Sequence, residues 1–97
     1  MEVIENATQL KALLLECAQD PGRPGWLRCH VEVKQTDPVP NLPSLVHAAV
    51  GDNLSVLISP ADQSQVEALK PGTEINLQVR RRAPDVHTAV PGSVTVE

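Results

Sequence analysis

The sequence almost lacks aromatic residues: it has no Phe, no Tyr and a single Trp, Trp26. Proteins that bind single-stranded nucleic acids often stack bases on aromatic side chains, and each stacked base contributes about 1–3 kcal/mol. That mode of binding has almost no side chains to use here. The net charge of −4 also disfavours strong non-specific nucleic-acid binding, which needs many cations at phosphates. It leaves room for a local basic face.

Cysteine is scarce as well: Cys17 and Cys29 are the only two, and there is no Cys-x-x-Cys pair. Zinc-ribbon and thioredoxin-like folds therefore lose their main support. We expect two reduced thiols that act as small buried apolar groups, with a disulfide between them as the alternative. Alternation along a strand would send Cys29 to the face opposite His30 and Glu32, so these three residues do not converge on a metal. We expect no metal and no cofactor.

No apolar run approaches the roughly 18–20 residues that a membrane-spanning helix needs. The first six residues are acidic and show neither the basic segment nor the apolar segment of a secretory signal. We therefore expect a cytoplasmic protein without membrane association. A secreted chain whose signal had been removed would look the same.

Motifs for catalysis are missing too. The serines lie in no nucleophile-elbow motif, and no glycine-rich phosphate loop is present. The carboxylates are scattered, so no acid–base pair stands out. We expect that the protein is not an enzyme.

What the sequence contains is enough for one folded domain. It has 97 residues, of which 41% are hydrophobic, and its 9 Pro and 5 Gly lie well below the content of low-complexity segments. We expect a single domain over residues 1–97, with an N-terminal helix within 1–20 and a β-barrel over 26–97.

The spacing of apolar residues predicts an amphipathic helix over residues 7–19. Its apolar stripe comes from residues spaced by three or four positions: Leu10, Leu13, Leu14 and Cys17. Asn6 would cap it, and the Asp20-Pro21-Gly22 sequence would end it. Such a stripe must dock on the same domain or on a second copy of the chain.

Alternation of apolar and polar residues predicts the strands and is clearest over residues 26–35 and 74–82. Further strands are expected over 45–50, 54–59 and 86–90 and through Val94 and Val96, with a short helix over 61–69. In this arrangement Leu57 points out of the sheet, where a helix or a partner would cover it.

The Leu69-Lys70-Pro71-Gly72 turn, which opens an alternating strand, resembles turns of many small barrels, OB-like and molybdate-binding modules alike. With the order of three strands, a helix and two strands, residues 26–97 resemble an OB-fold, a five-stranded Greek-key barrel. An SH3-like barrel or a small sandwich is the alternative. The fold class expected is mainly β (α+β). The resemblance implies that ligands such as single strands or oligosaccharides bind on strands two and three.

One cluster of charge stands out, at Arg80, Arg81 and Arg82. Alternation puts Arg80 and Arg82 on one face. The first and fourth strands of an OB-like barrel are neighbours, which would bring Arg28 and Lys34 beside them as a basic strip. This strip is either a solvated, salt-bridged edge or a contact for phosphate, nucleic acid or an acidic partner.

Two functions are therefore carried forward. The first is a non-catalytic binding or adaptor module that acts through protein–protein contacts, with homodimer formation included. The candidate contact residues are Leu10, Leu14, Leu57 and Trp26. The alternative is a weak single-stranded nucleic-acid binder. The candidate contact residues for it are Arg28, Lys34, Arg80 and Arg82.

Overall fold

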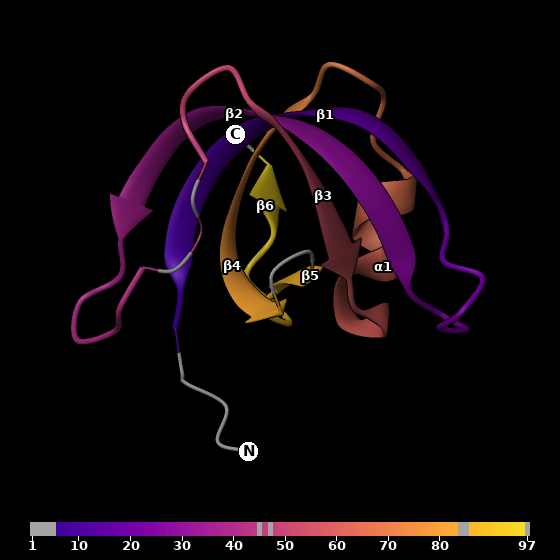
Figure 1. The fold of residues 1–97 in the computed structure, drawn as a ribbon. Coiled ribbons are helices and arrows are strands. Elements are labelled where there is room, and N and C mark those ends of the chain that lie inside the picture. The colour runs from indigo at the N-terminus through magenta and orange to yellow at the C-terminus, as the bar shows by residue number, and fades with distance from the viewer. Residues whose placement is uncertain (1–5, 45, 47, 84–85, 97) are drawn as a thin grey trace.

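A computed structural model describes residues 6–44, 46, 48–83 and 86–96. These residues form six strands and one helix, and the first two strands arch over the rest of the molecule (Figure 1). In chain order the elements are β1 Thr8–Gln19, β2 Leu27–Pro38, β3 Asn53–Ile58, α1 Pro60–Glu67, β4 Glu74–Ala83, β5 Val86–Ala89 and β6 Thr95–Val96.

The sheet closes on itself as a barrel. Its strand order is β1-β2-β3-β5-β4, β4 pairs in turn with β1, and β6 adds a short strand along β4. The β3–β5 pair is parallel, with Leu57 opposite Thr88, and the other pairs are antiparallel. The resemblance to an OB-like small barrel is therefore confirmed, and the protein is mainly β.

The expected N-terminal helix is wrong: these residues form β1. Leu10, Ala12 and Leu14 alternate into the core, but a β-bulge between Leu14 and Glu16 shifts the phase by one residue. Cys17 then returns to the inner side in place of Glu16. The resulting spacing of three and four imitates a helical stripe, whereas pairing with β2 and β4 decides the structure.

The expected strand over residues 45–50 is also wrong, where it can be compared. Leu45 and His47 lie outside the described residues, and residues 48–50 are not in a strand. A turn takes their place, since Asp52 donates its backbone N–H to the Ala49 carbonyl and accepts a bond from the Ala49 N–H on its carboxylate (3.0 and 2.9 Å). The chain keeps five barrel strands because β1 replaces this one.

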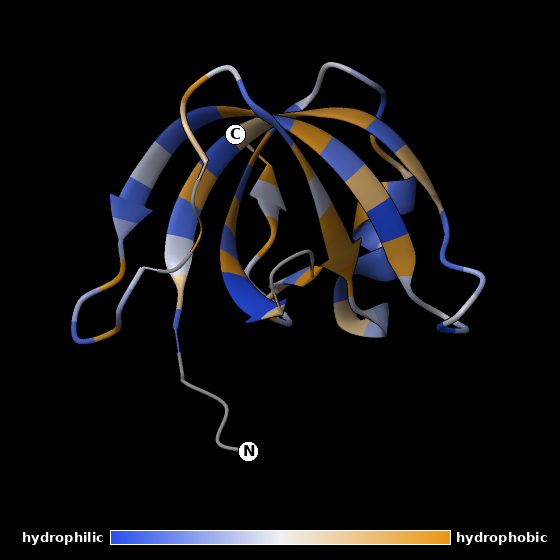
Figure 2. Cartoon of the chain, in the orientation of Figure 1, coloured by the Kyte–Doolittle hydropathy of each residue, from blue (hydrophilic) through white to orange (hydrophobic). Residues whose placement is uncertain are grey.

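The other elements agree closely with the sequence. Figure 2 shows hydrophilic and hydrophobic residues alternating along β2, as a strand with one buried face requires. The core is formed by the inner residues of all the barrel strands together with α1 and two loop positions: Leu10, Ala12, Leu14, Leu27, Cys29, Val31, Val33, Val46, Val56, Ile58, Val66, Ile75, Leu77, Val79, Ala89 and Val94.

The turn before β4 is fixed by backbone contacts with β1. Gly72 has a φ of 90°, a conformation that favours glycine, and its N–H donates to the Leu14 carbonyl (2.6 Å). Leu14 in turn donates to the Thr73 carbonyl (2.9 Å). Among the described residues, these are the last backbone hydrogen bonds that β1 makes on this side.

Candidate functional site

The structure places three of the four expected protein-contact residues away from solvent. Leu10 and Leu14 are 0% and 3% exposed and belong to the core. Leu57 does lie on the outer side of β3, but it is only 5% exposed. Trp26 is half-buried just before β2, where its carbonyl accepts a bond from the Asp20 N–H (3.0 Å). The contact surface proposed from the sequence is therefore not assembled.

Strand pairing changes the neighbours of the expected basic residues. Arg28 lies on β2, which is not adjacent to β4: β1 lies between them on one side of the barrel, and β3 and β5 lie between them on the other. One row of the sheet nevertheless runs from Arg28 to Leu57, from Leu57 to Thr88, and from Thr88 to Arg80. Arg28 and Arg80 thus share the outer face without being neighbours.

Two further arginines join this row. Arg82 approaches Thr88 with its Nε (3.4 Å), and Arg23 joins Arg28 around the buried carboxylate of Asp20, at 3.3 Å each. We call the four residues the arginine face: Arg23, Arg28, Arg80 and Arg82. Lys34 does not join them, since it forms an ion pair with Glu32 further along β2.

The arginine face has little depth. The hollow between Arg23, Arg28 and Leu57 measures about 30 Å³, and its other walls come from β3 and β5: Ser55, Val86 and His87. A surface this shallow fits an extended anion lying across it better than a small molecule enclosed in it.

A larger groove, which sequence reasoning missed, lies between β1 and α1. It has a volume of about 370 Å³, at the low end of the roughly 300–1,000 Å³ of ligand clefts. Its walls are mostly apolar and come from β1, the start of β2, α1 and the turn before β4: Leu14, Leu15, Glu16, Cys17, Ala18, Gln19, Leu27, Val66, Glu67, Leu69 and Pro71.

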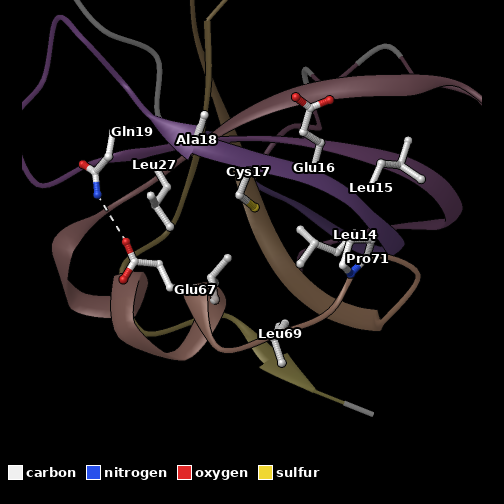
Figure 3. Close-up of a pocket in the computed structure, with 11 residues that line it drawn as sticks. Leu14, Leu15, Glu16, Cys17, Ala18, Gln19, Leu27, Glu67, Leu69 and Pro71 are labelled. Carbon is white, nitrogen blue, oxygen red and sulfur yellow. Dashed lines mark hydrogen bonds between the residues drawn. The ribbon is translucent and has the colours of Figure 1, made fainter.

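Figure 3 shows how these walls face each other. Cys17 and Leu27 lie between β1 and the helix, and Leu69 approaches from the opposite side, while Glu16 points away from α1. At one end the amide of Gln19 donates to the Glu67 carboxylate (3.2 Å), which joins β1 to α1. The other end is bounded by the turn through Pro71.

The groove exists because β1 loses its second neighbour halfway along. β4 pairs with β1 only from Thr8 to Leu13, and the turn before β4 takes over at Leu14. Within the described part of the chain, residues 16–19 pair with β2 alone, and the bulge residue Leu15 has no partner in the sheet register. This stretch is an open strand edge, and we call it the β1 edge.

A disulfide joins Cys17 and Cys29 beside the groove, so the expectation of two reduced thiols is wrong and the alternative holds. The two residues lie directly opposite each other on β1 and β2, with their Cα atoms 4.1 Å apart. The sequence does contain a signal for this pairing. Both cysteines lie six residues from Arg23, in the middle of the Pro- and Gly-rich turn, as in a symmetric hairpin.

Among the described residues, no group of three or more His, Cys, Asp or Glu residues is placed to hold a metal ion. In the same part of the chain, no helix has the length and apolar character needed to cross a membrane.

Comparison with known proteins adds no family. No protein-family model matches the sequence, and no curated protein matches it significantly.

Proposed function

We propose that the protein is a non-catalytic binding module and that a partner protein binds in the groove between β1 and α1. The observation that carries this proposal is the β1 edge lying beside an apolar groove of about 370 Å³. Open edges of this kind pair with other chains, and apolar grooves bind side chains. Leu15, 37% exposed, extends the apolar surface at the rim.

A display library of random twelve-residue peptides, selected on the immobilised protein, tests this function. We expect enriched peptides that bind the wild type but lose binding to Leu69→Glu, because Leu69 is a half-buried groove wall. Val50→Glu is the matched control, since Val50 is 67% exposed and does not line the groove. Peptides that bind Leu69→Glu as well as wild type, or no enrichment at all, would contradict the proposal.

The disulfide bears on the compartment. The sequence leads us to expect the cytoplasm, where thiols are kept reduced, but structural disulfides persist mainly in oxidising compartments. The Cys17–Cys29 bond therefore supports an oxidising compartment instead. Alkylation of free thiols in freshly lysed source cells tests this: a protein without labelled cysteines supports it, and complete labelling contradicts it.

A second candidate function is binding of single-stranded nucleic acid on the arginine face. It is supported by the row that joins Arg28 to Arg80 and by the approach of Arg82 to Thr88. The ion pairs of Arg23 and Arg28 with Asp20 reduce the charge available, and aromatic side chains for stacking are lacking. We therefore rank it below protein binding.

Fluorescence anisotropy with a labelled oligothymidylate at about 50 mM salt tests this candidate. Binding should weaken steeply as salt rises and should disappear in Arg80→Glu/Arg82→Glu. The double variant Lys34→Glu/Lys70→Glu makes the same change in net charge away from the arginine face and should bind almost as wild type. No binding at low salt would remove this candidate.

A further inference from the structure

The hydrogen-bond phase of the β1–β2 pair shows which backbone groups the β1 edge offers. In an antiparallel pair, opposite residues alternate between hydrogen-bonded pairs about 5.5 Å apart and non-hydrogen-bonded pairs about 4.5 Å apart. Cys17 and Cys29, with Cα atoms 4.1 Å apart, are of the second kind. The N–H and C=O of Cys17 therefore point away from β2, toward the groove side.

A second observation gives the same phase. The Asp20 N–H donates to the Trp26 carbonyl (3.0 Å), which makes this a bonded pair. Gln19, opposite Leu27, is then non-bonded like Cys17, and its N–H and C=O also point toward the groove side. The β1 edge thus offers two donors and two acceptors at the spacing of a β-ladder.

We propose that an extended segment of a partner protein adds to the β1 edge as a further strand, with aliphatic side chains in the groove and a basic side chain beside Glu16. The proposal rests on the proposed function and deepens it, because it names how the partner binds and what its chemistry is. Backbone bonds would supply affinity, and alternate side chains would supply specificity.

Alternation of the added strand assigns these side chains. Residues beside Cys17 and Gln19 face α1 and meet the apolar walls Val66 and Leu69. Residues beside Glu16 and Ala18 face outward, as Glu16 itself does. Opposite charges on neighbouring strands stabilise the pairing, so Lys or Arg is favoured beside Glu16.

Charge argues against a second copy of this chain as the occupant. The groove has two acidic residues in its walls, Glu16 and Glu67, and no Lys or Arg among the described residues that line it. Two β1 edges paired with each other would place two such acidic walls side by side, without a Lys or Arg in the described lining of either. A basic partner segment removes this repulsion, and a copy of the chain adds to it.

The edge is already shaped for a short strand. The disulfide and the β2 ladder hold it on one side, and the Gln19–Glu67 hydrogen bond fixes its position against α1. The turn at Gly72, bonded to Leu14, stops any added strand at the other end. Little ordering of the protein is needed on binding, which favours affinity.

The probe for the experiment is a blocked seven-residue peptide that alternates valine with lysine and threonine, carries a fluorophore and is titrated to about 1 mM. We expect saturable binding, monitored by anisotropy. The same peptide methylated on the backbone nitrogens that would bond to the edge should bind at least about tenfold more weakly, because its side chains are kept and its donors are lost.

Two pairs of variants test the same contacts from the protein side. Gln19→Pro removes the outward N–H and should reduce binding at least about tenfold, whereas Gln19→Ala, which also loses the bond to Glu67, should retain it. Glu16→Lys should weaken binding of the lysine peptide and improve binding of a peptide with glutamate in its place. Asp37→Lys makes the same charge change at an exposed position of β2, and it should change the binding of neither peptide.

The outcomes separate this inference from the proposed function. Equal binding of the methylated and unmethylated peptides overturns strand addition but leaves a protein-binding groove. If the probe does not bind while library peptides bind through Leu69, strand addition is likewise overturned and the protein-binding groove is retained. If Gln19→Pro fails to fold, the methylated peptide still decides the question. Dimers of the free protein that the neutral variant Glu16→Gln strengthens would overturn the choice of occupant.

Discussion

Asn6 is joined to Arg81, 75 positions further along the chain, by two hydrogen bonds between its side-chain amide and the Arg81 backbone. The Asn6 Nδ2 donates to the Arg81 carbonyl (3.0 Å), and the Arg81 N–H donates to the Asn6 Oδ1 (2.8 Å). The side chain thereby continues the β1–β4 ladder beyond its last backbone pair, Thr8 with Val79. Asn6 is 3% exposed, so water is a poor substitute for either bond.

Asn6→Ala should lower the free energy of unfolding by about 1–3 kcal/mol, because it leaves a backbone donor and acceptor without partners. Urea unfolding followed by the fluorescence of the lone Trp26 measures this as a lower midpoint with an unchanged slope. Asn6→Asp keeps the acceptor but puts a carboxylate oxygen against the Arg81 carbonyl in a buried site, so it should not rescue the loss. An Asn6→Ala midpoint equal to that of wild type would contradict the structural role.

The disulfide should make stability depend on redox conditions. Reduction of the Cys17–Cys29 bond, which closes a short loop with a sequence separation of 12, should cost about 2–4 kcal/mol. Urea unfolding with and without a phosphine reductant measures the loss. The variant Cys17→Ala/Cys29→Ala should unfold at the lower midpoint in both conditions. An equal urea midpoint of the wild type with and without the reductant would show that the disulfide does not stabilise the fold.

Replacement of Ser59, unlike the changes above, should not lower the stability of the protein. Serine at the N-cap of a helix usually stabilises it, and its replacement by Ala costs about 0.5–2 kcal/mol. Here Ser59 makes no side-chain capping bond to α1, and its Oγ is the one buried side-chain polar atom without a partner among the described residues. Ser59→Ala should therefore leave the unfolding midpoint unchanged or raise it. A loss of 1 kcal/mol or more would indicate a hydrogen bond to this hydroxyl.

Leu10 and Leu13 distinguish strand from helix in solution. A helical stripe would bury both residues, whereas β1 buries Leu10 completely and leaves Leu13 partly exposed on the other face. Leu10→Ala should cost about 2–5 kcal/mol, and Leu13→Ala should cost clearly less. Equal losses in thermal or urea unfolding would favour the helical stripe.

The parts of the fold that sequence reasoning predicted are those with uninterrupted alternation. β2 and β4 alternate in one register over most of their length, so residues 26–35 and 74–82 were predicted close to their true bounds. β1 was not, because one bulge residue at Leu15 changes the phase and creates helical spacing. A bulge is fixed by pairing with other strands, which a local pattern does not contain.

The candidate site was harder to predict for the same reason. The groove arises where β4 stops pairing with β1, and that point depends on the register between segments about 60 residues apart. The sequence did predict that Arg80 and Arg28 would share an outer face, but for the wrong reason, because it assumed that their strands were adjacent. Leu57 was correctly placed on the outer side of its strand, although it is covered.

The pairing of β1 with β4 also determines when the barrel can close during synthesis of the chain. β1 and β2 can form a hairpin early, but the barrel remains open until the chain has been made as far as Val79 and Ala89, whose strands close it. Until then the inner faces of β1 and β2, with Leu10, Leu14 and Val31, face water. Folds dominated by such distant pairings form in about milliseconds to seconds. During synthesis the chain therefore exposes the apolar inner face of the β1–β2 hairpin. Chaperones can bind this face until the last third of the chain has been made.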